Sequence, residues 1–256
     1  MAKTFTVLLL IAAAAVFWIT FPYLRARMPD DFQKLSGPER VKLAREAQGK
    51  AIAQKFKDAG LPYPAREIFI RWLKREAVVE LWAREDRGKL HLIASYEILA
   101  ESGDPGPKRR EGDRQVPEGF YEIDRFNPES RFHLSLGVNY PNAADRILSD
   151  RDKPGGDIFI HGKDVSIGCA PIGDTGIEQL YLAALDTRDR GQARIPVHIF
   201  PTRMRGAEWT AFAAEHPALA AFWEHLQPAY DAFERDRRVP AVTVAPDGSY
   251  RVTPAR

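Results

Sequence analysis

The sequence predicts a mostly β domain with flanking helices, and three observations support this fold class. Short segments in which apolar and polar residues alternate recur between residues 67 and 203, and alternation is the period of a half-buried strand. Clusters of turn-forming residues separate these segments. Segments with the wider apolar spacing of helices lie on both sides, at 36–59 and 207–237. We therefore expect a sheet framed by helices.

The composition is that of a folded protein with a substantial core. Of the 256 residues, 45% are hydrophobic and 28% are charged, which is too apolar for a disordered chain. The length fits one large domain or two small ones. Lys and Arg total 37 and Asp and Glu total 35, so the net charge is +2. This near-balance argues against a nucleic-acid binder recruited by bulk charge, and we expect no nucleic-acid partner.

A segment of 21 residues without a charge lies near the N-terminus, from Thr4 to Leu24. It is long enough to span a bilayer and lacks the polar stripe of a buried soluble helix. It is therefore a signal anchor or a cleaved signal peptide. Small residues at 12–15 would suit cleavage, but the apolar run continues over 16–21, so we favour an anchor. In either case we expect the rest of the chain in the periplasm or cell envelope.

The first predicted helix after this segment follows a polar connector at residues 25–37. Ser36-Gly-Pro-Glu39 has the pattern of a capping box, with a Ser cap and with Pro and Glu in the first turn. The helix continues to Ala59, where Gly60 and Pro62 end it. Its outer face carries Lys, Arg and Glu, which indicates a solvated surface.

Seven strands are predicted in the central region. Glu85-Asp-Arg-Gly88 lies between two of them and predicts a hairpin turn. Residues 101–119 are rich in Gly, Pro and charge, so we expect a long loop there, and long loops in compact domains are often functional. The strands are expected at 67–74, 78–84, 89–100, 119–124, 131–138, 157–160 and 195–200.

The C-terminal part of the chain is predicted to be mainly helical. Asp174 is the expected N-cap of a helix at 177–185. Two further helices are expected at 207–216 and 217–237, followed by a hairpin that turns on Pro246-Asp-Gly248. The organisation that follows is a signal anchor or signal peptide at 1–24, a linker and framing helix at 25–66, a catalytic domain at 67–203, and a helical extension with a short hairpin at 204–256.

Cys169 is the single cysteine, which excludes an intramolecular disulfide and any zinc or iron–sulfur site built on paired cysteines. One interpretation is structural: the cysteine is a small buried apolar residue. The other is a reactive thiol, because exported proteins tend to pair their cysteines or to lose them. At this point both interpretations stay open.

The surroundings of Cys169 carry the elements of nucleophilic catalysis. A short apolar strand delivers His161 to its end, and Gly162 permits a tight bend there. Seven residues separate His161 from Cys169, and Gly168 lets the backbone turn sharply before the thiol. A helix that begins near Asp174 would lower the pKa of the thiol. A nucleophile, a base and backbone donors are what cysteine acyl transfer needs, although a histidine that ends a strand is more often structural.

The string I-H-G-x3-S-x-G-C at 160–169 resembles the active-site signature of the YkuD-like L,D-transpeptidase catalytic domain family. The short interval and the S-I-G-C ending are most similar to the YafK/DpaA-like branch. Gly112–Tyr121 (GDRQVPEGFY) is similar to the family's G-D-x-x-T-P-E-G-x-Y segment. Asn127–Leu136 and Asn139–Asn142 resemble the signature of the branch. The resemblance covers roughly residues 67–203.

This resemblance implies a β-sandwich catalytic domain and a set of roles. Cys169 would attack the carbonyl of a meso-diaminopimelate residue in a peptidoglycan stem peptide, and His161 would take the thiol proton. The backbone carbonyl of Gly162 would orient the imidazole. Backbone N–H groups of Ile167, Gly168 and Cys169 would form the oxyanion hole. Neither a metal nor a cofactor is expected.

Two departures from the family pattern concern substrate binding. Ile167 stands where most members have a second histidine. The arginine that usually follows the cysteine is absent, because Ala170-Pro-Ile172 occupies its place. Another cation would have to hold the substrate carboxylate. The substrate-binding candidates are Ser166, Lys163, Tyr140, Asn142, Arg125 and Arg146.

The function predicted from these residues is that of an exported cysteine acyl-transfer enzyme. It would be an L,D-transpeptidase, or an L,D-endopeptidase or amidase that releases a murein-linked lipoprotein. Its partners would be peptidoglycan stem peptides, such a lipoprotein, and the membrane through residues 4–24. The alternative is a catalytically retired protein that binds murein or serves as an envelope scaffold, motivated by Ile167 and the absent arginine. A redox-sensing thiol is a third interpretation.

Overall fold

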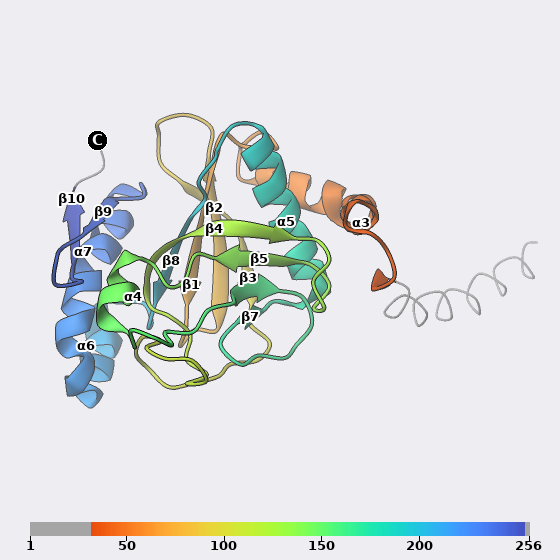
Figure 1. Ribbon diagram of the computed structural model, residues 1–256. Helices are drawn as coiled ribbons and strands as arrows, with labels where there is room; N and C mark the ends of the chain where they lie inside the picture. Colours follow the sequence, from red (N-terminus) through yellow and green to blue (C-terminus); the bar gives the residue numbers. More distant parts are fainter. Residues whose placement is uncertain (1–31, 254–256) are drawn as a thin grey trace, which may run out of the picture.

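The computed structural model describes residues 32–253 (Figure 1). The predicted membrane or signal segment at 4–24 lies outside these residues. Within 32–253, no helix has both the length and the apolar character that crossing a membrane requires.

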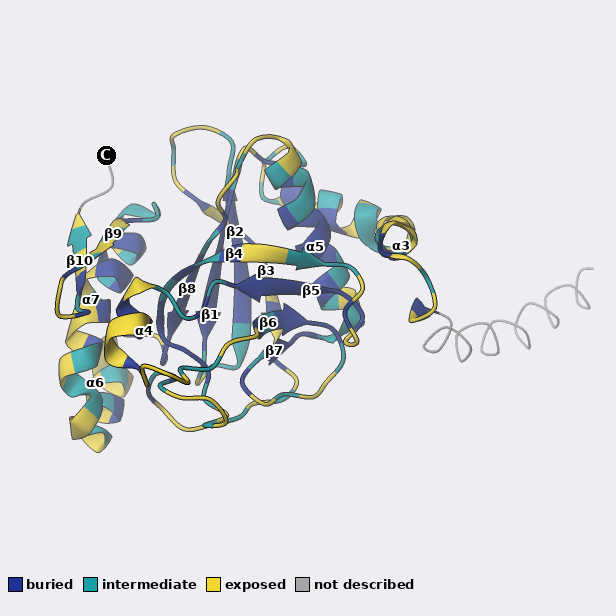
Figure 2. Ribbon diagram, in the orientation of Figure 1, coloured by how far each residue is buried: buried dark blue, intermediate teal, exposed yellow. Residues whose placement is uncertain are grey.

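One eight-stranded sheet forms the centre of the molecule, in the order β3-β2-β1-β8-β4-β5-β6-β7. In Figure 1, β4 and β5 run across β1, β2 and β8, so the sheet curls. Most of its strand residues are buried (Figure 2). The predicted mostly β fold with flanking helices is confirmed. The strands are β1 (Glu67–Leu73), β2 (Val78–Arg84), β3 (His91–Glu97), β4 (Gly119–Asn127), β5 (Ser135–Val138), β6 (Ile158–His161), β7 (Ala170–Pro171) and β8 (Pro196–Phe200).

The sheet joins segments that are far apart in the sequence. β1 and β2 are antiparallel, with Ile70 opposite Leu81, and the predicted hairpin at Glu85–Gly88 joins β2 to β3. On its other side β1 pairs in parallel with β8, where Ile70 lies opposite Val197. All three side chains are fully buried. This apolar centre fixes the register, because a shift by one residue would turn these side chains to the other face.

Two helices cover one side of the sheet. α3 (Gly37–Asp58) begins at the predicted capping box, where the backbone N–H of Ser36 donates to the Glu39 carboxylate at 2.9 Å. It lies beside α5 (Gly173–Asp189) (Figure 1), and the main apolar core contains buried residues of both helices and of the strands. Both helices flank the sheet.

The predicted start of the helix after the cysteine is wrong. We expected a helix at 177–185 with Asp174 as its cap, but α5 begins at Gly173 with Ile172 at the cap position. The Asp174 carboxylate instead accepts a hydrogen bond from the backbone N–H of Lys163 at 2.9 Å. The side chain was expected to cap its own helix, but it accepts a hydrogen bond from the loop after β6.

The C-terminal segment packs on the opposite side of the sheet from α3 (Figure 1). Its main helix carries a buried stripe that includes Trp223, Leu226 and Tyr230, and this stripe packs against Phe200 and Leu73 of the sheet. The two predicted helices and the hairpin are confirmed. The elements of the segment are α6 (Gly206–Glu215), the short 3₁₀ helix η1 (Pro217–Leu219), α7 (Ala220–Asp236), β9 (Ala241–Val244) and β10 (Tyr250–Thr253).

A buried carboxylate connects this segment to the long loop at 101–118. Glu118 has no exposed surface. Its oxygens accept hydrogen bonds from Lys74 Nζ at 2.8 Å, the backbone N–H of Gly106 at 2.9 Å and the indole N–H of Trp223 at 2.7 Å. The Lys74 ammonium neutralises the charge, and the other donors satisfy the remaining lone pairs, as a buried carboxylate requires.

Candidate active site

The pairing of β6 with β7 brings His161 and Cys169 to one face of the sheet. The two strands are parallel, with Ile160 opposite Ala170, and both of these side chains are fully buried in the core. Successive side chains of a strand point to opposite faces. Phe159, His161 and Cys169 therefore share the face directed away from the core, and all three line one cavity.

The imidazole of His161 is oriented by the next peptide group. His161 is 2% exposed, and its Nδ1 lies 2.5 Å from the carbonyl oxygen of Gly162. A carbonyl only accepts, so Nδ1 carries the proton and Nε2 has the free lone pair that a base needs. A Cβ at Gly162 would lie 2.8 Å from the Phe132 carbonyl oxygen and 2.6 Å from the Asp174 carboxylate. Any side chain at position 162 would clash with these atoms, so only glycine fits there.

The loop before the cysteine is held by Ser166. Its hydroxyl accepts the backbone N–H groups of Gly168, at 3.2 Å, and Cys169, at 3.0 Å, and donates to the Cys169 carbonyl at 2.8 Å. Gly168 has φ +126°, a region that favours glycine. Ile167 is 78% exposed at the rim of the cavity. Two of the three N–H groups expected in the oxyanion hole thus donate to Ser166 in this conformation.

The Cys169 thiol is half-buried and donates to the backbone carbonyl of Asp157, with an S···O distance of 3.5 Å. Between residues 32 and 253, no hydrogen bond joins the thiol to His161. Burial raises the pKa of the thiol above its ordinary value of 9.0, against an opposing hydrogen bond from the backbone of Phe159. The expectation that this pKa is lowered is wrong, because desolvation raises it by more than the hydrogen bond from Phe159 lowers it.

Burial also shifts the titration of His161. Desolvation lowers the pKa of the imidazole below its ordinary value of 6.5, and the hydrogen bond to Gly162 only partly opposes this. The histidine is therefore neutral at pH 7, and the cysteine is protonated. The resting pair is a thiol and a neutral base, and proton transfer would have to accompany attack on a substrate.

Alkylation of Cys169 by iodoacetamide is expected to accelerate about tenfold per pH unit from about pH 6 to about pH 9, because the thiolate is the reacting form and the pKa of the thiol is raised. The rate constant can be measured by intact-mass spectrometry over this range. A rate that is constant around pH 7 would contradict the expectation, since it would indicate a preformed thiolate–imidazolium pair.

The cavity that contains both residues has a volume of about 530 Å³. We call it the histidine cavity. Asn127, Ser135 and His161 lie opposite one another on β4, β5 and β6, so they form a polar row across its wall. Phe132 and Ile167 add exposed apolar surface. Its remaining lining residues are Ser130, Arg131, Asp157, Phe159, Val165, Ser166 and Cys169.

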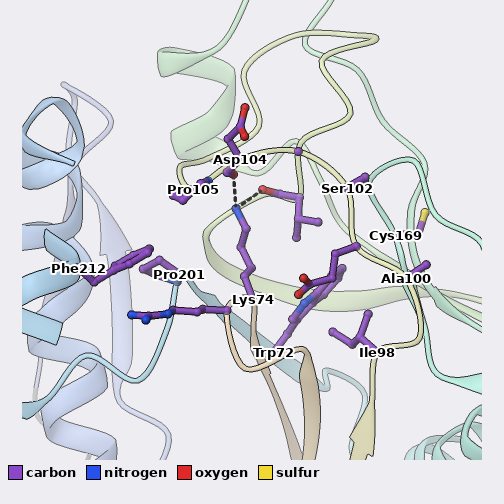
Figure 3. A pocket seen from close by; sticks show the side chains of 14 residues that line it. Trp72, Lys74, Ile98, Ala100, Ser102, Asp104, Pro105, Cys169, Pro201 and Phe212 are labelled. Atoms are coloured by element: carbon purple, nitrogen blue, oxygen red, sulfur yellow. Dashed lines mark hydrogen bonds between the residues drawn. The ribbon is translucent and has the colours of Figure 1, made fainter. Parts of the chain in front are cut away.

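Cys169 also lines a second cavity, of about 250 Å³ (Figure 3). The long loop at 101–118 and the C-terminal segment contribute to its wall, the latter through Phe212 of α6. The side chain of Lys74 extends along it and donates to backbone oxygens of the loop, including that of Gly106 at 2.8 Å. The thiol therefore lies between two cavities.

Most of the substrate-binding candidates from the sequence line neither cavity. Lys163 forms an ion pair with Asp174 at 3.0 Å. Tyr140 is buried and donates to the Pro154 carbonyl at 3.0 Å. Asn142 and Arg146 belong to α4 (Ala143–Leu148), the former as its N-cap. Only Ser166 reaches the site directly, and Arg125 lies beside it through an ion pair with Asp157 at 3.1 Å.

A buried arginine of α3 anchors the β4–β5 loop, residues 128–134. Arg40 is 4% exposed. Its guanidinium donates to the carbonyl oxygens of Ser130 at 3.0 Å, Gln33 at 2.7 Å and Leu35 at 3.0 Å. These bonds fix the backbone of the loop against the start of α3. The framing helix thus contributes to the site although it supplies no lining residue.

The β4–β5 loop contains lining residues that the sequence analysis missed. The Phe132 ring packs on His161 with a centroid distance of 4.6 Å, and its carbonyl accepts the N–H of Gly162 at 2.9 Å. Arg131, beside it, is exposed and lines the histidine cavity. Phe132 and Arg131 were predicted to lie in a strand at 131–138, but that prediction is wrong at its start, because β5 begins only at Ser135.

No family model matches the chain. The YafK protein of Escherichia coli (strain K12), whose name assigns it to the L,D-transpeptidases, is 35% identical over 188 residues, which cover 73% of this chain and 74% of that protein. Among solved structures, the helical cell shape determining protein Pgp2 from Campylobacter jejuni is 17% identical with a TM-score of 0.43, covering 70% and 73% of the two chains. Bd1075 from Bdellovibrio bacteriovorus is 21% identical with a TM-score of 0.37, covering 66% and 60%.

Proposed function

Because the chain belongs to the L,D-transpeptidase family, we propose that it is an exported enzyme that transfers acyl groups of peptidoglycan stem peptides through Cys169. One observation carries the proposal: Cys169 and His161 line the same cavity, and the imidazole Nδ1 is bonded to the Gly162 carbonyl. A nucleophile beside an oriented base is what covalent acyl transfer requires.

In the first half-reaction, Cys169 Sγ attacks the carbonyl carbon of a meso-diaminopimelate residue. The thiol proton passes to Nε2 of His161 as the S–C bond forms. The tetrahedral intermediate then collapses, the C–N bond of the amide breaks, and His161 returns the proton to the leaving amine. A thioester on Cys169 and a free amine remain, with the charges balanced.

The intermediate carries a negative oxygen that needs hydrogen-bond donors. The proposed donors are the backbone N–H groups of Ile167, Gly168 and Cys169. Since the Ser166 hydroxyl accepts from two of them at 3.0 and 3.2 Å, the oxyanion would take its place. Ser166 would then be free to bond to the substrate, which agrees with its location in the cavity wall.

In the second half-reaction, an amine or a water attacks the thioester and releases Cys169. An amine gives transpeptidation, and water gives hydrolysis, including release of a murein-linked lipoprotein. The second cavity supports either outcome, because it gives a second reactant its own approach to Cys169. The proposed location is the periplasm or cell envelope, where peptidoglycan lies. Membrane attachment through residues 4–24 stays a prediction.

The test is incubation of the full chain with diaminopimelate-containing muropeptides, with and without an amine acceptor, followed by mass spectrometry of the products and of the protein. The matched control is the same protein alkylated beforehand with iodoacetamide at alkaline pH, which blocks its single cysteine. New cross-links identify a transpeptidase, and a shortened or released peptide identifies a hydrolase. Both require a thioester adduct on Cys169 that the control lacks.

The alternative is a retired enzyme that binds murein. It is favoured by the thiol's bond to Asp157 instead of His161, and by the occupation of the expected oxyanion donors by Ser166. If the untreated protein gives neither products nor an adduct but sediments with murein sacculi, the enzymatic proposal is rejected in favour of this scaffold.

A further inference from the structure

Arg131 is an unpaired cation in the histidine cavity. It lies in the β4–β5 loop, and its side chain is exposed. Among residues 32–253, its guanidinium has neither an ion-pair nor a hydrogen-bond partner. Most other arginines near the site are engaged: Arg40 with backbone carbonyls, and Arg125 with Asp157. A guanidinium without a partner beside a nucleophile is available for an anion.

The carboxylate in the lining of the histidine cavity is paired with another arginine, not with Arg131. The other charged side chain in the lining is Asp157, which forms an ion pair with Arg125 at 3.1 Å, and Arg125 also pairs with Asp124 at 3.2 Å. The remaining lining is neutral, since the imidazole of His161 is uncharged at pH 7. Arg131 is therefore the one arginine in the described lining, and no carboxylate of residues 32–253 is paired with it.

The backbone that carries Arg131 is held firmly. Arg40 donates to the carbonyl of the preceding residue, Ser130, at 3.0 Å. On the other side of Arg131, the Phe132 carbonyl accepts the N–H of Gly162 at 2.9 Å. Because both neighbours are fixed, an anion bound by this guanidinium orders little besides the side chain itself.

The strands that line the histidine cavity offer polar groups for a peptide. Ser135 is 2% exposed, and its hydroxyl has no hydrogen-bond partner among residues 32–253. It lies between Asn127 and His161 in the cross-strand row. A ligand with a carboxylate, peptide groups and an aliphatic chain would match the cation, this row and the apolar rim.

We propose that Arg131 binds the free side-chain carboxylate of the diaminopimelate residue whose acyl group passes to Cys169. This inference rests on the proposed function for the identity of the substrate. The planar guanidinium suits a carboxylate, since it donates two parallel hydrogen bonds. Arg131 would thereby supply, from the β4–β5 loop, the cation that is absent after the cysteine.

The first test does not depend on murein chemistry. Iodoacetate is an anion and iodoacetamide is its neutral counterpart, and both alkylate the thiolate with loss of iodide. We expect the ratio of their rate constants, measured at pH 8 and low salt, to fall by about three- to tenfold in Arg131→Gln. Arg131→Lys should retain most of the ratio. Arg87→Gln is the matched control, because Arg87 is exposed in the β2–β3 turn.

The second test uses two stem peptides, one with the free side-chain carboxylate of diaminopimelate and one in which that group is amidated. We expect the wild type to prefer the acid by about tenfold or more in kcat/KM, as for a hydrogen bond to a charged group. In Arg131→Gln, KM for the acid should rise, and the preference for the acid over the amide should disappear. A merely structural role would lower kcat for both peptides.

The two tests separate the possible failures. If the wild type processes neither peptide but the alkylation ratio depends on Arg131, the anion site stands and the proposed function is rejected. If both peptides are processed and Arg131→Gln changes neither the ratio nor the preference, the assignment of Arg131 is overturned and the proposed function stands.

Discussion

Cys169→Ala is expected to lower the rate of acyl transfer by at least about 10⁴-fold, which is the scale of loss when a covalent nucleophile is removed. No second cysteine in the chain can replace it. Without the thiol, no thioester forms, and only the weak catalysis of an aligned water remains. The rate is measured with the diaminopimelate muropeptides, from the amount of product per time by mass spectrometry.

The fold should survive this substitution. Cys169 is half-buried, and its thiol donates one long hydrogen bond, to the Asp157 carbonyl. We expect the free energy of unfolding to change by less than about 1 kcal/mol. Cys169→Ser, which keeps the size and the polar atom, serves as a second variant. Unchanged activity in the folded Cys169→Ala protein would end the proposal of acyl transfer through this residue.

Arg40→Met is expected to lower the free energy of unfolding by about 3 kcal/mol or more. The methionine keeps much of the length of the side chain but removes every donor. The carbonyls of Ser130, Gln33 and Leu35 would lose their bonds to the guanidinium, and each buried acceptor left unsatisfied costs about 1–3 kcal/mol. Denaturation by urea, followed by circular dichroism, measures the change.

Arg45→Met is the matched control on the same helix. Arg45 forms an ion pair with Asp186 at 2.6 Å, but its side chain is 46% exposed. Because exposed pairs contribute little, this substitution should cost less than about 1 kcal/mol. Equal losses of unfolding free energy in the two variants would show that burial does not increase the contribution of Arg40 to stability.

Arg40→Met should also reduce activity at a temperature where the variant is still folded. Arg40 acts through the β4–β5 loop, whose residue Phe132 contacts His161 and bonds to Gly162. A loosened loop would misalign the base and the Arg131 guanidinium together. The expected signature is a lower kcat with a weaker preference for the free carboxylate over the amide.

Local patterns in the sequence predicted the elements well, because each of them depends on nearby residues. The capping box at Ser36 and Glu39 marks the start of α3, since both partners lie within one turn. The turn at Glu85–Gly88 marks the hairpin of β2 and β3. The family resemblance, supported by a relative 35% identical, identified the fold and drew attention to His161 and Cys169.

The parts that sequence reasoning missed depend on contacts between distant segments. Asp174 looked like a helix cap, but its carboxylate is bonded to Lys163, and the same ion pair removes Lys163 from the substrate-binding candidates in the cavity wall. The direction of the thiol's pKa shift was wrong because burial cannot be read from neighbouring residues. Arg131 lines the histidine cavity only because β5 pairs with both β4 and β6, an arrangement that neighbouring residues do not reveal.

The three hydrogen bonds donated to Glu118 also concern whether the C-terminal segment can be separated from the rest of the protein. The sequence suggests a division between residues 203 and 204, as if the C-terminal helices were an appendage. A chain cut there would remove Trp223 from a carboxylate that has no contact with solvent, and would take Phe212 from the wall of the second cavity. The tail is therefore not an interchangeable module: any exchange of it between relatives would also redesign the approach to the thiol.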